Sequence, residues 1–316
     1  MSIDFFGFPV SVIDRIAGEL HLADLLNLGI LSKRSRQVSR LALRPYACEM
    51  KIKFERGSIP TLEFTNGTYF CYQPLAPEFE ESQLEKFKDY IKQYFPLFTG
   101  NLKIAISFKH LGSSNFVAAI LDIVHLSKVP VTNLILEEYT GNQLIMKSIS
   151  LCSETTSLSL MCRPTIYGFR DEIGRSLANK VLGSQKLEIF WSKWVTPEII
   201  MKNFKKCKEL LLHNSSFDQL DVIRILKHWK TGSSIRKLRL NVGQRWYGAQ
   251  IFRELEGDYF FDGFRPFPYQ FMVPAMLPNC FVIAQDNTGV RAVIAYQDNE
   301  AHGTLVLDCD SPLLQY

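Results

Sequence analysis

The sequence predicts an α/β protein in which a helical N-terminus precedes an irregular solenoid of strand–helix repeats that ends in a β-hairpin cap. Apolar residues recur at helical spacing in the first 45 residues, and a Leu-x-Leu pattern returns six times between residues 102 and 240. Alternating apolar segments follow residue 280. With 316 residues, of which 47% are hydrophobic, the chain can bury two or three cores.

Three short helices are expected at the N-terminus. The first begins near Pro9, since a proline at a helix start loses no backbone hydrogen bond. Its apolar face holds Val12, Ile13, Ile16 and Leu20. The second is expected from about Ala23 and Asp24, and its apolar residues are Leu25, Leu26 and Leu28. The third is expected from about Leu31 to Leu41, with basic residues on its solvent side: Lys33, Arg34, Arg36 and Arg40. So small a unit cannot bury all of its apolar surface, and either the rest of the chain or a partner must cover the surplus.

This N-terminus resembles the F-box family. The family motif has Leu-Pro, then Ile or Leu four and seven positions further on, then a Leu-Leu pair and Cys/Ser-Lys-Arg. Without a gap, these stand here as Phe8-Pro9, Ile13, Ile16, Leu25-Leu26 and Ser32-Lys33-Arg34. Two positions depart from the motif: Phe8 replaces Leu, and Ser35 stands where many members have Trp, which should weaken contact with the family's partner.

The resemblance implies that these helices bind a Skp-family adaptor and, through it, a cullin. The contact residues it implies are Pro9, Ile13, Ile16, Leu20, Leu25, Leu28, Leu31 and Lys33. The alternative is a helical subdomain that simply packs on the body of the protein. Whether the basic residues of the third helix meet an acidic adaptor or solvent stays open.

Residues 47–100 are expected to form two or three antiparallel strands and one helix. Apolar alternation marks the strands around Met50–Phe54, Thr61–Phe64 and Tyr69–Tyr72. The segment Ser82–Glu85 has the sequence of a capping box and predicts a helix that ends at Pro96. Its inward residues would be Leu84, Phe87, Ile91 and Phe95.

A repeated strand–helix unit is expected from residue 101 onward. The recurring pairs are Leu102/Ile104, Leu134/Leu136, Leu158/Leu160, Leu187/Ile189, Leu210/Leu212 and Leu238/Leu240. Their first members are 32, 24, 29, 23 and 28 residues apart, and most intervals contain an amphipathic helix. Thr196-Pro197-Glu198 has the sequence of a helix N-terminus, and Gly232 that of a helix C-terminus.

Six such units indicate a leucine-rich-repeat-like solenoid, because each is too small to bury its own apolar face. The asparagine usual three residues after the second leucine is absent. Its positions hold Ser107, Tyr139, Arg163, Ser192, Ser215 and Gly243. We therefore expect the ladder that caps strand carbonyls to be lost and the solenoid to be irregular and short. An ordinary α/β domain whose strands share the pattern is the alternative.

One part of this body resembles the F-box-associated domain of nematode F-box proteins. The similarity spans roughly residues 190–245 and rests on these segments: Trp194-Val195-Thr196, Cys207-Lys208-Glu209-Leu210, Asn214-Ser215, Leu226-Lys227-His228-Trp229-Lys230 and Gly232. The two domains occur together in that family, so each resemblance supports the other.

The candidate target-binding surface is the sheet face opposite the paired leucines. Strand alternation sends the residues between and just after each pair to that face, which in a solenoid is the concave binding surface. It would carry Lys103, Glu137, Ser159, Met161, Glu188, Phe190, His213, Arg239 and Asn241. Phe190 and Met161 at its centre suit a protein interface better than a nucleic-acid groove. Loops at the convex edge or the C-terminal hairpin are the alternative.

The C-terminal segment predicts a β cap. Phe281–Ile283 and Val290–Tyr296 suit a hairpin around Asp286–Gly289, and Thr304–Leu307 can add a third strand. The uncharged span Pro266–Gln285 is long enough to cross a bilayer, but its four prolines would break a helix. It is expected to be buried loop and strand in a soluble protein.

No catalytic, metal or cofactor site is expected. The sequence contains no Gly-rich phosphate loop, no nucleophile elbow and no zinc-ligand spacing. Its seven cysteines form no CxxC pair and suggest free thiols in a reducing compartment, the cytoplasm or nucleus. A net charge of +4 does not favour nucleic acid, and the run Lys202, Lys205, Lys206 and Lys208 is expected to be a solvated helix end.

Four regions follow from these patterns: an F-box at 1–46, a joining region at 47–100, the repeat body at 101–245 and a β cap at 246–316. Together they predict the substrate-recognition adaptor of an SCF-type ubiquitin ligase, which holds a target protein and is not itself an enzyme. The alternative is a repeat-type binding scaffold that joins no ligase. Exposure of the N-terminal apolar stripe discriminates between the two. A hydrolase or transferase has no convergent set of reactive residues to support it.

Overall fold

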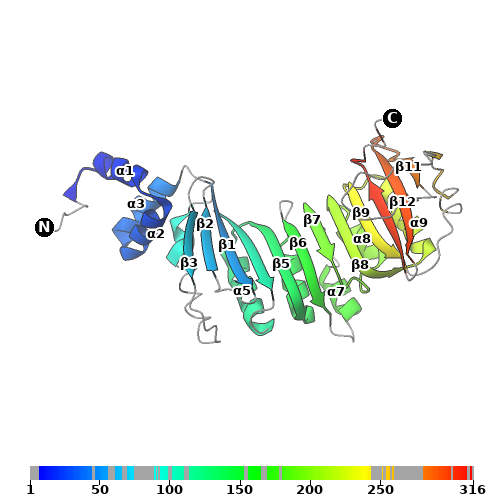
Figure 1. The fold of residues 1–316 in the computed structure, drawn as a ribbon, viewed down its shortest axis with the longest axis horizontal. Coiled ribbons are helices and arrows are strands. Elements are labelled where there is room, and N and C mark those ends of the chain that lie inside the picture. The colour runs from blue at the N-terminus through cyan, green and yellow to red at the C-terminus, as the bar shows by residue number, and fades with distance from the viewer. Residues whose placement is uncertain are drawn as a thin grey trace. The chain divides into compact units, whose positions relative to one another are not determined.

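The fold is α/β, as predicted, and the chain forms two compact units, Met1–Tyr139 and Thr140–Tyr316 (Figure 1). This computed structural model describes residues 7–44, 47–55, 61–65, 70–74, 89, 91, 93–98, 102–109, 114–152, 156–164, 169–177, 180–242, 251, 254–256, 258–259, 280–299, 302–311 and 314. The four regions expected from the sequence remain predictions. The first unit contains the N-terminal helices and the joining region, and the second contains the C-terminal strands.

Three helices open the first unit, as predicted. They are α1 (Val10–Glu19), α2 (Leu22–Leu31) and α3 (Lys33–Leu43). Helix α3 begins at Lys33, slightly later than expected, because Leu31 ends α2 and Ser32 caps α3. The Ser35 backbone N–H donates to Ser32 Oγ at 3.1 Å, and the Ser32 N–H donates to Ser35 Oγ at 2.8 Å. Ser35 is thus a buried capping residue.

A mixed sheet follows in the same unit. Its strands are β1 (Cys48–Glu55), β2 (Thr61–Thr65), β3 (Phe70–Pro74), β4 (Leu102–Lys109) and β5 (Val131–Thr140). β3, β2 and β1 are antiparallel neighbours, whereas β1, β4 and β5 run parallel in that order. The strands expected around Met50, Thr61 and Tyr72 are therefore confirmed. Helix α5 (Ser114–Ser127) connects β4 to β5.

Aromatic packing forms the core beneath β1 and β4. Phe54 stacks on Phe108 with ring centroids 4.9 Å apart and meets Phe116 of α5 edge-on at 5.5 Å. The helix predicted from Ser82 to Pro96 falls mostly outside the described residues. Within its C-terminal part, Ile91 is helical and buried, and Pro96 lies in the short 3₁₀ helix η2 (Phe95–Leu97). Leu97 packs closely against Gly29 of α2.

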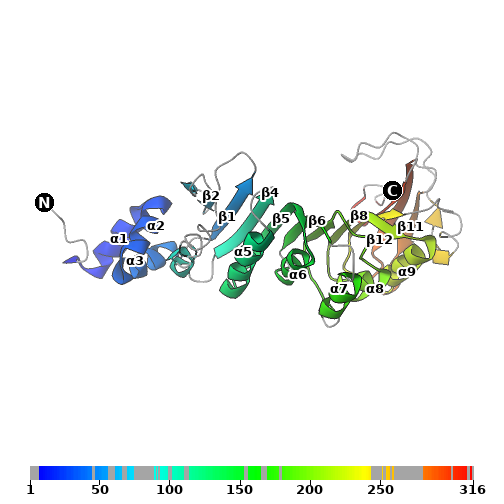
Figure 2. The ribbon, with the colours of Figure 1, turned by 90° about the horizontal axis from the view of Figure 1, so that it is seen from below.

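The second unit begins with four parallel strands arranged in chain order. They are β6 (Ser157–Arg163), β7 (Lys186–Ile189), β8 (Glu209–Phe217) and β9 (Lys237–Val242). Their helices are α6 (Asn142–Ser150), α7 (Phe169–Leu177), α8 (Pro197–Asn203) and α9 (Gln219–Lys230). Figure 2 shows these helices on one face of the strands. We call the opposite side of β6–β9 the open face.

The paired leucines form the core between strands and helices. Leu158, Leu187, Leu210 and Leu238 are in register across β6–β9, and each is at most 1% exposed. The residues at the second position of each pair align and are buried in the same way. The predicted helix ends are also confirmed. Thr196 Oγ1 accepts from the Ile199 N–H at the start of α8, and Gly232 takes a φ of 114° just after α9.

The expectation that the carbonyl-capping ladder is lost is wrong for two repeats. Ser192 and Ser215 hold two of the positions that lack asparagine. Ser192 Oγ donates to the carbonyl oxygen of His213 at 2.7 Å, and Ser215 Oγ donates to that of Asn241 at 2.5 Å. A hydroxyl is long enough for this link because the neighbouring strand lies within hydrogen-bonding distance at these points. Serine therefore provides part of the contact that asparagine provides in regular repeats.

Four antiparallel strands complete the second unit. They are β10 (Asp258–Tyr259), β11 (Cys280–Ala284), β12 (Arg291–Asn299) and β13 (His302–Asp308). β13 pairs with β9, and β12, β11 and β10 follow outward, so the predicted hairpin and third strand are confirmed. Of the uncharged span 266–285, residues 266–279 lie outside the described residues, and Cys280–Ala284 is strand. No helix in the described part of the chain is long and apolar enough to cross a membrane.

Candidate binding surfaces

Exposed apolar side chains are concentrated in the N-terminal helices. Nine large apolar residues are exposed in the described parts of the chain, and six of them precede residue 45. These six are Phe8, Val10, Val12, Ile16, Leu31 and Leu41. Val12 and Ile16, 39% and 37% exposed, are one helical turn apart on the same side of α1. Exposed apolar surface of this kind normally marks an interface.

The predicted adaptor-contact residues divide into exposed and buried sets. Pro9, Ile16, Leu31 and Lys33 are exposed, and Leu20 and Leu28 are half-buried. Ile13 and Leu25 are each only 4% exposed and lie inside the helical bundle, so in this structure they are core residues rather than contact residues. Phe8, Val10, Val12 and Leu41 are exposed apolar residues that the predicted set left out. For Val12, the sequence did offer a signal, because Val12 lies four residues before Ile16 and therefore on the same side of the helix.

Helix α3 presents a basic exterior beside these apolar residues. Lys33, Arg34 and Arg40 are exposed, and Arg36 is half-buried. The helix carries no acidic residue. Its inward side is formed by Ser35, Val38, Ser39 and Leu43, so the basic residues face away from the bundle.

The candidate target-binding residues lie on the sheet positions that alternate with the buried leucines. Lys103 and Glu137 occupy such positions on β4 and β5 of the first unit. The second unit contributes seven half-buried residues of the open face: Ser159, Met161, Glu188, Phe190, His213, Arg239 and Asn241. Ser159 aligns with Glu188, so these side chains lie in rows across neighbouring strands. That they bind a target stays a prediction.

Glu188 is the centre of an interaction cluster on the open face. Its carboxylate lies 3.1 Å from His213 Nε2 and 3.0 Å from Lys186 Nζ. The ring of Phe190 stacks on the His213 ring with centroids 4.5 Å apart. The His213 hydrogen bond, with help from Lys186, lowers the pKa of Glu188 to about 2, although partial burial opposes the shift. Glu188 is therefore a stable carboxylate whose charge is already matched.

A charged row borders this cluster at the start of the strands. Lys186, Glu209, Lys237 and Asp308 align across β7, β8, β9 and β13 and alternate in sign. Lys237 Nζ lies 3.7 Å from Glu209. The predicted target-binding residues did not include this row, although the alternation of side chains along each strand places it on the same face. Alternating signs disfavour a uniformly charged ligand, such as a phosphate backbone, on this part of the face.

The carboxyl ends of β6–β8 hold a second group of side chains. The Arg163 guanidinium lies over the Trp191 ring, 4.2 Å from its centroid. β8 is irregular after Leu212, where Asn214 takes a left-handed φ of 51°. Asn214 Nδ2 then donates to the carbonyl oxygen of Phe190 at 3.0 Å. Binding residues of parallel sheets commonly gather at this end of the strands, and bulges often redirect side chains there.

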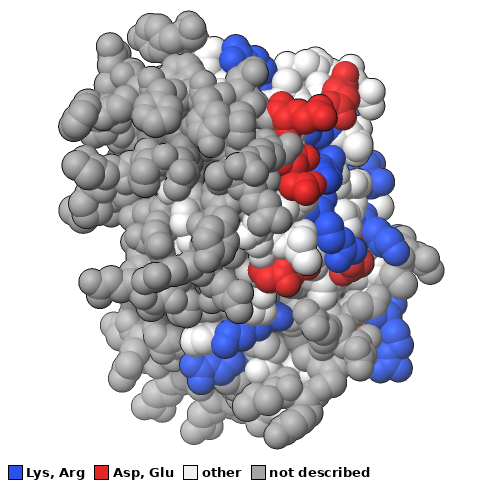
Figure 3. All heavy atoms as spheres, turned by 90° about the vertical axis from the view of Figure 1, so that its right-hand side faces the viewer, with Lys and Arg blue, Asp and Glu red and all other residues white. Residues whose placement is uncertain are grey.

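In the view of Figure 3, basic and acidic side chains lie beside one another in the upper and middle part of the described surface, whereas the charged side chains in its lowest part are mainly basic. The basic run near α8 is exposed, as expected from the sequence. Lys202, Lys205, Lys206 and Lys208 are all exposed around the end of that helix. Within the described ranges, no group of three or more His, Cys, Asp or Glu could hold a metal ion.

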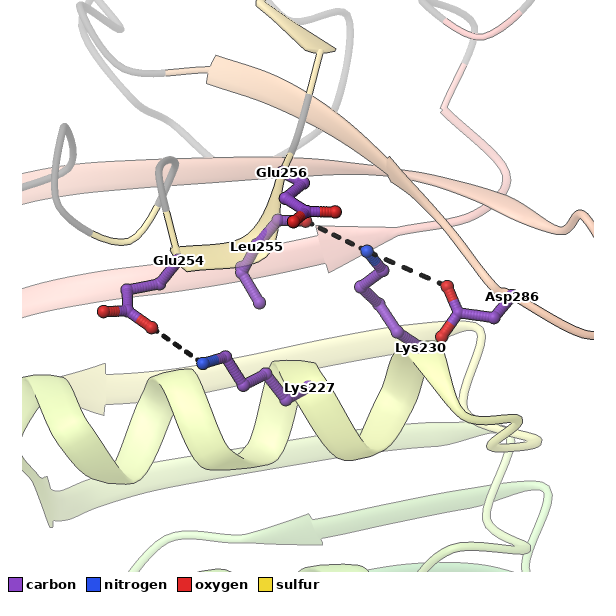
Figure 4. A pocket seen from close by; sticks show the side chains of 6 residues that line it. All are labelled: Lys227, Lys230, Glu254, Leu255, Glu256 and Asp286. Carbon is purple, nitrogen blue, oxygen red and sulfur yellow. Dashed lines mark hydrogen bonds and ion pairs between the residues drawn. The ribbon is translucent and has the colours of Figure 1, made fainter.

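A small hollow of about 240 Å³ lies between α9 and the C-terminal strands (Figure 4). Its polar groups already bind one another. Lys227 Nζ lies 2.7 Å from Glu254, and Lys230 Nζ donates to the carbonyl oxygen of Leu255 at 3.0 Å. Lys230 also lies 3.8 Å from Asp286. These contacts connect α9 to the cap and leave little polar capacity for a ligand.

The sequence matches no protein-family model, and a search of curated proteins finds no match.

Proposed function

We propose that this chain is a substrate-recognition adaptor of an SCF-type ubiquitin ligase. In this proposal, α1–α3 bind a Skp-family adaptor, which connects the chain to a cullin, and the second unit holds a target protein. The chain itself contributes proximity and orientation to the ubiquitin-transfer reaction, and no covalent step is assigned to it.

The observation that carries the proposal is the concentration of exposed apolar residues in the N-terminal helices. Val12 and Ile16 remain accessible although Ile13 and Ala17 on the adjoining side of α1 are buried. A helical subdomain that only packed on the body would be expected to use such residues for that packing. The residues of α1–α3 that resemble the F-box motif give the accessible surface a specific candidate partner.

The body supports the target-binding half of the proposal. Parallel strands in chain order, in-register buried leucines and helices on one face are features of a leucine-rich-repeat-like solenoid. The open face of such an assembly offers an extended surface that includes Phe190 and Met161. Cys48, Cys152, Cys162, Cys207 and Cys309 are free thiols, which suits a reducing cytoplasm or nucleus.

Co-purification with a Skp-family adaptor tests the proposal. The variant Val12→Asp/Ile16→Asp introduces two charges at exposed positions, so the fold should persist. An adaptor that covers these positions would bury both charges, which costs several kcal/mol and should remove most of the bound adaptor. The matched control is Leu126→Asp/Leu220→Asp, which makes the same change at residues that are 78% and 65% exposed on α5 and α9.

The expected result is adaptor recovery with the wild type and the control, and loss with the α1 variant. Equal recovery from all three would show that α1 is not the docking surface. Absence of adaptor with the wild type would favour the alternative function, a repeat-type scaffold that joins no ligase.

A further inference from the structure

The carboxyl ends of β6–β8 carry two ring contacts, made by the consecutive residues Phe190 and Trp191. Arg163 lies on Trp191, and Phe190, the preceding residue, lies on His213. The two contacts therefore span three neighbouring strands, and we call these four residues the aromatic row. Trp, Tyr and Arg are enriched among the residues that contribute most binding energy at protein interfaces, and the aromatic ones combine a large apolar area with few rotatable bonds.

Backbone contacts hold the aromatic row in place. The Ser192 N–H and Oγ both donate to the carbonyl oxygen of His213, at 3.2 and 2.7 Å. Asn214 Nδ2 donates to the carbonyl oxygen of Phe190 in the opposite direction. Hydrogen bonds thus connect the residues that follow β7 to β8 at both Phe190 and His213. A surface ordered before binding loses less conformational entropy on association.

The charges around the row leave a surplus of cations. Glu188 is the carboxylate of this cluster, and His213 and Lys186 already bind it. Arg163 and Lys193 are exposed, and no carboxylate pairs with either of them in the described part of the chain. Trp191 orients the Arg163 guanidinium without neutralising it, since a ring supplies a quadrupole and no charge.

We propose that the aromatic row recognises an acidic segment of a target protein. A carboxylate of that segment pairs with Arg163, and a neighbouring apolar side chain packs on Trp191 and Phe190. The assignment rests on the proposed role of the second unit in target binding and adds the chemistry of the target to it. The acidic residues of the charged row, Glu209 and Asp308, lie at the other end of the strands and disfavour a long polyanion across the whole face.

Fluorescence anisotropy with three labelled peptides tests this assignment on the full chain. The peptides alternate phenylalanine with glutamate, glutamine or lysine. We expect the glutamate peptide to bind most tightly. Arg163→Glu and Trp191→Ala should each weaken its binding about tenfold or more, as expected for hot-spot residues. Arg163→Gln, which keeps the size of this exposed side chain, should have an intermediate effect and covers the case in which Trp191→Ala folds poorly.

Lys202→Glu is the matched control, because it makes the same charge change at an exposed residue of α8 and should leave peptide affinity unchanged. Equal affinity for the three peptides, no binding of the glutamate peptide, or equal effects of Arg163→Glu and Lys202→Glu would overturn the assignment. Adaptor recovery with the same variants separates the two proposals. If the chain binds the adaptor but does not prefer the glutamate peptide, only this assignment is contradicted. If the chain prefers the glutamate peptide but does not bind the adaptor, only the ligase role is contradicted.

Discussion

The hydroxyl of Ser215 links two neighbouring parallel strands through the backbone of Asn241. Ser215 Oγ donates to the Asn241 carbonyl oxygen at 2.5 Å and accepts from the Asn241 N–H at 3.0 Å. Ser192 makes a related link to His213, one strand earlier. Ser107 holds the equivalent place in an earlier repeat, but its buried Oγ has no hydrogen-bond partner among the described residues. The same residue type thus has different energetic roles at equivalent positions.

We expect Ser215→Ala to lower the free energy of unfolding by about 1–3 kcal/mol, because it leaves backbone groups of Asn241 without their partner. Ser107→Ala is the matched control and should be neutral or slightly stabilising, since it removes a buried hydroxyl that makes no hydrogen bond to any described residue. Urea unfolding of both variants measures the difference. Equal destabilisation by the two substitutions would show that the ladder contributes nothing beyond packing.

The buried positions of the repeat body were predictable because strand side chains alternate with a period of two. Every paired leucine lies in the core for this reason, and the same alternation placed Glu188 and His213 on the open face. Trp191 could not be placed in this way. It follows the end of β7, where the chain is irregular, and its contact with Arg163 depends on how two strands end.

Helical periodicity predicted the N-terminal helices but not which part of their apolar stripe is covered. Val12 and Ile13 are adjacent in the sequence and both belong to the apolar stripe of α1. Ile13 is buried, whereas Val12 is 39% exposed. The difference depends on where α3 crosses α1, and that crossing is set by tertiary packing, which a periodic pattern does not contain.

Two glycines should respond oppositely to replacement by alanine. A Cβ at Gly303 of β13 would overlap the ring of Tyr296 on β12, whereas a Cβ at Gly18 of α1 would meet no atom within 4 Å. Gly303→Ala must displace a buried ring and should cost about 1–3 kcal/mol. Gly18→Ala should stabilise the protein by up to about 1 kcal/mol, because alanine restricts the unfolded chain and favours helix. Thermal unfolding distinguishes them, and destabilisation by Gly18→Ala would contradict the observed helix.

Glu188 should make part of the stability dependent on acidic pH. Its pKa falls from an ordinary value of 4.5 to about 2 in the folded protein. Because the pKa of Glu188 is lower in the folded state, its ionised form stabilises the protein at pH values above the pKa of the unfolded state. This contribution is lost as pH falls from about 4.5 to about 2. At neutral pH, the free energy of unfolding of the wild type should exceed that of Glu188→Gln by on the order of 2–3 kcal/mol. This difference should vanish at the lower end of that pH range.

Urea unfolding of both proteins across that pH range measures the effect of Glu188. His213→Phe keeps a ring beside Phe190 but removes the main hydrogen-bond donor. The pH dependence attributed to Glu188 should therefore shrink in this variant as well. An unchanged pH dependence in His213→Phe would show that the donor is not the cause of the lowered pKa.

The turn between β11 and β12 should stabilise the C-terminal end of α9. Three donors from this turn bind carbonyl groups of the last residue of the helix and of the residues just after it: Asp286 N to Lys230, Asn287 Nδ2 to Thr231 and Gln285 Nε2 to Ser233. The Gln285 bond measures 2.8 Å, and Gln285 is only 4% exposed. Its Oε1 also accepts a hydrogen bond from Thr288 Oγ1.

Gln285→Ala would leave buried polar groups unpaired on the helix end and in the turn, at a cost of about 1–3 kcal/mol. Asn287→Ala is the matched control. It removes an exposed amide and should cost under about 1 kcal/mol, because water can replace its bond. Hydrogen exchange of the last turn of α9 reports the effect locally. Faster exchange in Gln285→Ala than in Asn287→Ala is expected, and equal rates in the two variants would show that the turn does not cap the helix.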